Sequence, residues 1–245
     1  QFAKNHPLFR EDLFYQKERK NINYIFANCN NIKLSHDYEK IGSMLFDYLK
    51  KNKIVNSNIL LKNNNLDYIQ VERIIHGAKL KSYDFEIYKS NKKKNDTINI
   101  NVIGTNKSNS IHLRKKLSSI TEGVFFTRDL VSEPPNVLST DQYVKRLLSL
   151  KKLGIKINVL DEKKMMKLGM NSLLGVGKGS SCGSYLVTME WKGGKKNEKP
   201  LAFVGKGVCF DTGGISLKPP KFMEEMKYDM AGSAVVVGLL KSLAL

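Results

Sequence analysis

The sequence predicts an α/β protein in which helices cover sheets. Apolar residues recur at helical spacing in "DYEKIGSMLFDYLKKN", residues 37–52. Apolar and polar residues alternate in "TININVIG", residues 97–104, which is typical of a strand with one buried face. From residue 155 onward, strand-like and helix-like segments alternate, as they do in proteins whose sheets are layered by helices.

The first hundred residues are rich in asparagine and lysine and contain short structured pieces. The helix at residues 37–52 ends in lysines, whose charge suits the negative end of the helix dipole. We expect a strand within residues 52–61 and a second helix that starts near Leu66 and ends at Gly77. The alternation at residues 98–102 predicts a further strand.

A turn-rich stretch, "TNKSNS" at residues 105–110, predicts a domain boundary. The helical pattern that follows must end at Pro134 and Pro135, because proline cannot continue a helix. We therefore expect an N-terminal α/β domain in residues 1–106, a linking helix in residues 107–128 and a second domain in residues 129–245.

The second half begins with a helix that Thr140 and Asp141 cap and Gly154 ends. Its glycine-rich stretch, "LLGVGKGSSCGS" at residues 173–184, matches neither the phosphate-loop pattern nor the dinucleotide fingerprint, so we interpret it as a turn. The other predicted elements are strands at residues 155–161, 184–191 and 200–205 and helices at residues 162–170 and 230–245.

The composition is that of a soluble globular protein. The chain has 245 residues, of which 41% are hydrophobic and 26% charged, and it can bury a substantial core. No apolar run is long enough to span a bilayer. The chain starts without Met or a signal core and stops inside an apolar helical pattern, which we interpret as a fragment or processed piece. Cys29, Cys182 and Cys209 are scattered, which predicts a reducing compartment.

The formal net charge of +18 has two interpretations. A strongly basic protein is a candidate for binding nucleic acid or another anionic surface. Here, however, lysine is spread along the chain, and arginine, the better reader of base edges, is scarce. No basic motif with interleaved aromatic residues is present. We favour distributed, solvated lysines and expect neither a nucleic-acid partner nor a membrane.

Two familiar catalytic patterns are disfavoured. His6, His36, His76 and His112 all precede the alternating half, so we interpret them as surface or packing residues and expect no Ser-His-Asp triad. The run that starts at Asp211, Asp-Thr-Gly, also occurs in aspartic proteases. That fold carries two such loops that share a proton, whereas this α/β pattern has one copy.

Four charged side chains make up the candidate site: Lys206, Asp211, Lys218 and Asp229. Asp211 follows a predicted strand and Asp229 precedes a helix, and ligands bind at the carboxyl ends of strands in α/β sheets. Two carboxylates brought together there need a proton or a cation between them. Oxygen ligands suit Mn, Mg or Zn. On spacing alone, surface lysines and helix-capping aspartates explain these residues equally well.

The longest recognisable stretch is "VGKGVCFDTGGISLKPPKFMEEMKYDMAGSAVVVG", residues 204–238. It closely resembles the metal-binding stretch of the leucine (cytosol) aminopeptidase family. "RDLVSEPPNVLST", "LDEKKMMKLGMNSLLGVGKGS" and "MEWKGG" resemble the preceding segments of that family in the same order. The resemblance covers residues 121–245. It implies a variable N-terminal α/β domain followed by part of an α/β/α metallo-aminopeptidase catalytic domain.

The resemblance implies a two-metal exopeptidase that releases leucine-like N-terminal residues from short peptides. Lys206, Asp211 and Asp229 match family metal ligands, with Asp211 bridging two ions that are Zn or Mn, with Mg as an alternative. Lys218 matches the lysine that polarises the substrate carbonyl. Lys206 can ligate only as a neutral amine, so the resemblance implies a depressed pKa for Lys206.

The resemblance also implies that Met226 forms a wall of the pocket for the N-terminal side chain, with Phe222 nearby, and that Cys209 is a buried packing residue. The family is typically hexameric and cytoplasmic, with an organelle as the alternative location. Its later Asn-Thr-Asp-Ala-Glu-Gly-Arg motif is absent, so we expect this chain alone to be inactive and its full-length parent to be active. The alternatives are a DNA-binding protein or an inactive structural paralogue.

Overall fold

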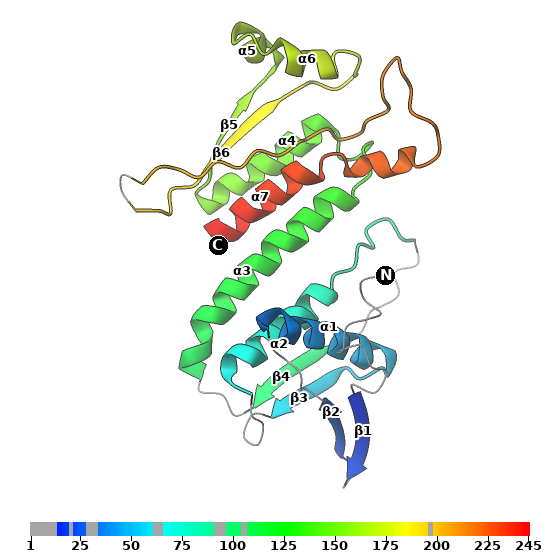
Figure 1. The fold of residues 1–245 in the computed structure, drawn as a ribbon, viewed down its shortest axis with the longest axis vertical. Coiled ribbons are helices and arrows are strands. Elements are labelled where there is room, and N and C mark those ends of the chain that lie inside the picture. The colour runs from blue at the N-terminus through cyan, green and yellow to red at the C-terminus, as the bar shows by residue number, and fades with distance from the viewer. Residues whose placement is uncertain are drawn as a thin grey trace. The chain divides into compact units, whose positions relative to one another are not determined.

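The computed structural model describes residues 14–19, 22–27, 34–60, 66–90, 97–103, 107–195 and 198–245. The chain separates into two compact units, residues 1–118 and residues 119–245. Both units mix helices and strands (Figure 1), which confirms the predicted α/β class. His6 and Cys29 lie outside the described residues. The finer domain limits inferred from the sequence stay a prediction.

In the first unit, β3 (Asn56–Leu60) and β4 (Asn99–Ile103) pair in parallel, and α2 (Tyr68–Lys81) lies between them in the chain. This is the crossover connection that a parallel pair requires. β1 (Phe14–Arg19) and β2 (Ile22–Ala27) form an antiparallel pair. α1 (Ser35–Lys51) packs on α2.

The predicted end of α2 at Gly77 is wrong, because the helix continues to Lys81. Gly77 serves close packing instead: a Cβ at this position would lie 1.9 Å from the carbonyl oxygen of Glu39 in α1. On the facing helix, a Cβ on Gly42 would lie 1.8 Å from the carbonyl oxygen of Ile74. The two helix backbones therefore touch at positions where only glycine fits.

The second unit starts within α3 (Lys107–Ser132), which ends just before the two prolines, as predicted. α4 (Thr140–Leu148) follows, and the capping side chain is Ser139, which accepts a hydrogen bond from the backbone N–H of Gln142 at 3.4 Å. The predicted cap was thus one residue late. A 3-10 turn (Ser149–Leu153) continues the helix and ends, as predicted, at Gly154, whose φ is 79°.

β5 (Lys156–Leu160) and β6 (Leu186–Glu190) pair antiparallel, and two short helices, α5 (Glu162–Lys167) and α6 (Asn171–Gly177), connect them. The interpretation of residues 173–184 as a turn is therefore wrong over its first part, since α6 includes residues 173–177. No phosphate loop forms there, because the glycine-rich run lies inside and after a helix rather than before one.

The predicted strand at residues 200–205 does not form among the described residues. A strand exists only when its backbone groups pair with a neighbouring strand. This segment runs without such a ladder, and its apolar side chains are exposed, with Leu201 at 86% and Val204 at 96%. The segment is apolar, as predicted, but none of the described strands pairs with it.

α7 (Ala231–Ala244) closes the second unit and packs beside α3 and α4 (Figure 1). A Cβ on Gly238 would lie 2.0 Å from the Thr127 hydroxyl and 2.6 Å from the carbonyl oxygen of Gly123, so α3 and α7 approach closely. The Thr127 hydroxyl also donates to the carbonyl of Ala234 at 3.1 Å.

The core of the second unit surrounds this helix contact. It consists of Leu130, Leu138, Tyr143, Leu147, Leu150, Ile155, Ile157, Cys209, Met230, Ala234 and Val237. Met230 and Ala234 are almost completely buried and fix the start of α7. Throughout the described residues, no helix combines the length and the hydropathy needed to cross a membrane.

We predict that Gly238→Ala destabilises the second unit by about 1–3 kcal/mol, because the added methyl overpacks the contact between α7 and α3. Trp191 is the single tryptophan of the chain and lies in this unit, so its fluorescence during urea unfolding reports on the second unit alone.

Gly175→Ala is the matched control, since nothing lies within 4 Å of a Cβ at that helical position. It should be neutral or stabilise by about 0.5–1 kcal/mol through helix propensity. Equal midpoints for the two variants would contradict the close contact.

Candidate metal and catalytic site

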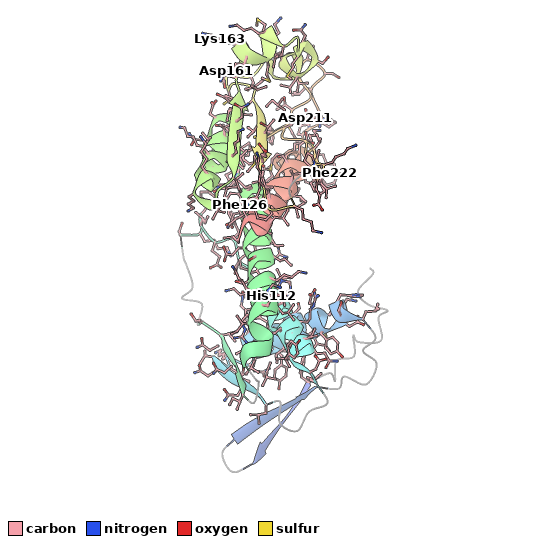
Figure 2. All side chains as sticks on the ribbon, turned by 90° about the vertical axis from the view of Figure 1, so that its left-hand side faces the viewer. His112, Phe126, Asp161, Lys163, Asp211 and Phe222 are labelled. Atoms are coloured by element: carbon pink, nitrogen blue, oxygen red, sulfur yellow. The ribbon has the colours of Figure 1, made fainter. Side chains whose placement is uncertain are left out.

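The candidate site lies on the irregular segment between β6 and α7, where Figure 2 labels Asp211 and Phe222. On this segment, Lys206 and Asp229 form an ion pair, with 2.7 Å between Nζ and Oδ1. The Lys206 side chain is 58% exposed, whereas that of Asp229 is only 19% exposed. A mostly buried carboxylate thus faces a mostly solvated ammonium.

A second ion pair joins Lys218 to Asp211, with 2.8 Å between Nζ and Oδ2. The other carboxylate oxygen of Asp211 accepts the backbone N–H of Gly213 at 2.8 Å. The N–H of Lys218 donates to the carbonyl of Thr212 at 2.9 Å and closes the loop. Gly213 and Gly214 have φ values of 92° and 80°, which glycine adopts without strain.

The ion pairs set the protonation preferences of the site. The hydrogen bond from Lys218, followed by that from Gly213, lowers the pKa of Asp211. The hydrogen bond to Asp229 raises the pKa of Lys206, which is opposite to the depression implied by the resemblance for a metal-bound lysine. The difference has a physical cause: in this structure the charge facing Lys206 is a carboxylate, which favours the ammonium form.

The two ion pairs also influence each other. The charge of Asp211 contributes to the raised pKa of Lys206, and the charge of Lys206 contributes to the lowered pKa of Asp211. The chain therefore brings together the four charged residues that the sequence singled out. We call these two ion pairs, Lys206–Asp229 and Lys218–Asp211, the charged cluster.

Backbone contacts hold Lys206 near Asp229. A Cβ on Gly205 would lie 2.5 Å from the Cα of Ser233 and 2.6 Å from the carbonyl oxygen of Gly232. The backbone N–H of Ser233 donates to the carbonyl of Lys206 at 3.0 Å. The loop that carries Lys206 therefore lies directly against the first turn of α7, a few residues after Asp229.

The donors fit a divalent cation. Asp229 Oδ2 is buried and has no hydrogen-bond partner among the described residues. A buried carboxylate oxygen without a partner is costly unless a cation or water satisfies it. The described residues contain no group of three His, Cys, Asp or Glu side chains that could hold a metal ion. The oxygen donors of this cluster are therefore the two carboxylates of Asp211 and Asp229, and Lys206 would add a nitrogen only as the neutral amine.

The two residues predicted to line a pocket lie in different surroundings. Met226 is in a 3-10 turn (Met223–Tyr228), and its sulfur lies 3.0 Å from the Lys218 ammonium, so it borders the charged cluster. Phe222 is 57% exposed. The Lys221 ammonium lies over its ring, 5.1 Å from the centroid. Of these two residues, only Met226 has a described contact with one of the four charged side chains.

Cys209 is 9% exposed and belongs to the core, which confirms its prediction as a packing residue. Burial raises the pKa of its thiol to about 11. The histidines that the structure describes also behave as predicted. His76 packs against Glu39 in the first unit, and His36 and His112 are exposed.

Two residues with a part in this geometry were not singled out from the sequence. Ser233 bonds the Lys206 carbonyl, and the small-residue run Ala231-Gly232-Ser233 directly after the Asp229 region is a signal that could have pointed to it. Tyr143 contacts Ser233 from α4, ninety residues earlier in the chain, and carries no such signal.

Comparison with known proteins identifies the family of this chain. Residues 125–245 match the catalytic-domain model of the cytosol aminopeptidase family. The chain belongs to the cytosol aminopeptidase family. A probable cytosol aminopeptidase of Phytoplasma australiense is 46% identical over 210 residues, which are 84% of this chain and 42% of that protein. One from Phytoplasma mali is 48% identical over 181 residues, or 71% of this chain and 36% of that protein. The chain thus spans less than half of these relatives.

Two solved structures share the fold. The bottromycin maturation enzyme BotP in complex with Mn has a TM-score of 0.77 over 94% of this chain and 50% of its own. A tomato leucine aminopeptidase mutant has a TM-score of 0.75 over 94% of this chain and 46% of its own. Each is 21% identical to this chain, so the likeness establishes the fold rather than the activity.

We predict that Gly213→Ala opens the loop that joins Asp211 to Lys218. A Cβ there would lie 2.4 Å from the carbonyl oxygen of Ser216, so the backbone must move. The amide of Lys218, which bonds the Thr212 carbonyl, should then exchange its hydrogen at least several-fold faster when followed by NMR.

Gly214→Ala is the matched control, because that position has the same sign of φ but nothing within 4 Å of a Cβ. It carries only the strain of an L-residue in the left-handed region. If both variants speed exchange at Lys218 equally, backbone conformation rather than the steric contact controls the loop.

Proposed function

We propose that the whole protein is a metal-dependent aminopeptidase that releases leucine-like N-terminal residues from short peptides. The observation that carries the proposal is the convergence of Lys206, Asp211, Lys218 and Asp229 in one cluster. This cluster lies within the segment that matches the family's catalytic domain. The tomato leucine aminopeptidase among the similar folds supports the proposal that the released N-terminal residue is leucine-like.

The proposed cofactors are two divalent ions, Mn or Zn with Mg as the alternative. Lys206, Asp211 and Asp229 would hold them, with Asp211 between the two ions. The unpartnered oxygen of Asp229 supports a cation at this point, and the Mn complex of BotP supports manganese. Divalent ions at such a site polarise the scissile carbonyl and lower the pKa of the attacking water.

The side chains of this chain have distinct roles in the proposed reaction. Lys218 presents its ammonium to the substrate carbonyl oxygen and stabilises the negative charge that develops there. Asp211 accepts a hydrogen bond from that ammonium at 2.8 Å and orients it. Met226, in contact with Lys218, and Phe222 offer apolar surface to the N-terminal side chain of the peptide.

We further propose that the whole protein assembles as a homo-hexamer in the cytoplasm. The family resemblance and the relatives' name, cytosol aminopeptidase, support this. DNA binding is one alternative, which the net charge of +18 would permit. An inactive structural paralogue is the other. The paralogue would bind metal without hydrolysing peptides, and a DNA-binding protein would show salt-dependent affinity for duplex DNA.

We predict that the 245-residue chain binds Mn²⁺ and that Asp229→Asn weakens binding at least about tenfold. Replacing the carboxylate removes a negative charge from a largely buried position beside the ion, and tenfold corresponds to about 1.4 kcal/mol. The electron paramagnetic resonance signal of free Mn²⁺ measures the dissociation constant.

Glu190→Gln removes a carboxylate from the same unit at an exposed position on β6, and it should leave the affinity unchanged. If Asp229→Asn and Glu190→Gln bind Mn²⁺ equally, the ion is held by general surface charge and the proposed site is wrong.

In the whole protein, Lys218→Met should lower kcat for a leucine anilide by about 100-fold with a smaller change in KM. Loss of one donor to the developing oxyanion typically has this effect. Steady-state hydrolysis with Mn²⁺ present measures it.

Lys221→Met is the control, because that lysine lies over the Phe222 ring on the same segment. Equal losses in the two variants would refute the specific role of Lys218. The same assay on the 245-residue chain tests the expectation that it is inactive alone.

A further inference from the structure

A hydroxyl pair connects α4 to the start of α7. Tyr143 in α4 is 6% exposed and belongs to the core of the second unit. Its hydroxyl lies 3.0 Å from the hydroxyl of Ser233, in the first turn of α7. A buried hydroxyl costs stability unless it is hydrogen-bonded, and the Ser233 hydroxyl provides the partner that Tyr143 needs.

The direction of these hydrogen bonds follows from the count of protons. The Ser233 hydroxyl donates to the carbonyl of Met230 at 2.8 Å. A hydroxyl has one proton to donate, so the Tyr143 hydroxyl must be the donor toward Ser233. Burial raises the pKa of Tyr143 to about 12, so this donor keeps its proton at neutral pH.

Ser233 passes this restraint to the candidate site through its backbone. Its N–H is among the first amides of α7, which have no acceptor within the helix, and it donates to the Lys206 carbonyl at 3.0 Å. The missing side chain of Gly205 permits the approach, since a Cβ there would overlap Ser233. The position of Ser233 therefore determines where the Lys206 loop lies relative to Asp229.

We propose that Tyr143 and Ser233 are positioning residues that hold the Lys206 loop opposite Asp229. The proposal rests on the metal site of the proposed function and adds to it the residues that keep Lys206 and Asp229 facing each other. Neither hydroxyl touches the substrate or the ion. Tyr143 orients Ser233, and Ser233 fixes the backbone of Lys206.

The test measures Mn²⁺ affinity of the 245-residue chain for Tyr143→Phe and Ser233→Ala. Each variant removes one hydroxyl and keeps the rest of the side chain. Since one hydrogen bond has a modest net effect, we expect affinity to fall about three- to tenfold in each. We expect the double variant to bind Mn²⁺ about as tightly as the weaker-binding single variant, because both hydroxyls act through one chain of hydrogen bonds.

Two controls separate positioning from general stability. Tyr185→Phe removes a different hydroxyl contact to the same helix α4, a donation to Asp141 at 2.5 Å. Val237→Ala opens a cavity beneath α7, where Val237 is 4% exposed. Both should lower stability, measured by Trp191 fluorescence, and leave Mn²⁺ affinity unchanged. Wild-type affinity in Tyr143→Phe, or equal losses in Val237→Ala, would overturn the proposal.

A second measurement is independent of metal. Hydrogen exchange of the Ser233 amide should become at least several-fold faster in Tyr143→Phe, relative to the amide of Val237 on the same helix. Unchanged exchange would overturn the positioning role even if the wild type binds no Mn²⁺. Absent Mn²⁺ binding with faster Ser233 exchange would refute the metal site and support the positioning of Lys206.

Discussion

The second unit depends on how closely other backbone segments approach α7. Gly238 meets α3 on one flank of the helix, and at its start the loop through Gly205 lies against Gly232 and Ser233. At both places a methyl group would overlap backbone or a short side chain, so α7 can pack in only one position. Asp229 lies two residues before α7, and Lys206 lies in the loop that contacts the first turn of the helix. The packing of α7 therefore also sets the separation of these two charges.

The electrostatics follow from that geometry. Two lysines and two aspartates lie on one irregular segment, and each lysine pairs with one aspartate rather than sharing a partner. The arrangement gives the two pairs different surroundings, since Asp229 is the more buried carboxylate and Asp211 is half-exposed and bonded to its own loop. The two aspartates therefore differ in their partners: Asp229 Oδ2 has no partner among the described residues, whereas each oxygen of Asp211 accepts one hydrogen bond, from Lys218 or from the Gly213 amide.

Local signals predicted much of the fold. Apolar periodicity located α1, β4 and α7, proline marked the end of α3, and Gly154 ended the turn after α4. The errors arose where tertiary contacts override local rules. Gly77 was predicted to end a helix but is a point of helix contact, and none of the described strands pairs with the apolar run at residues 200–205. The charged residues of the site were found through motif and resemblance, whereas Tyr143 could not be, because its role depends on a contact across ninety residues of chain.

The exposed run from Leu201 to Val204 bears on how this chain behaves in solution. An extended apolar segment with free backbone donors and acceptors is a template for pairing with another copy of itself. Lysines bracket the run, in "KGGKKNEKP" before it and at Lys206 after it, and charges at such flanks oppose stacking. These flanking lysines oppose the pairing of two such runs by charge repulsion, and the repulsion weakens as added salt screens them.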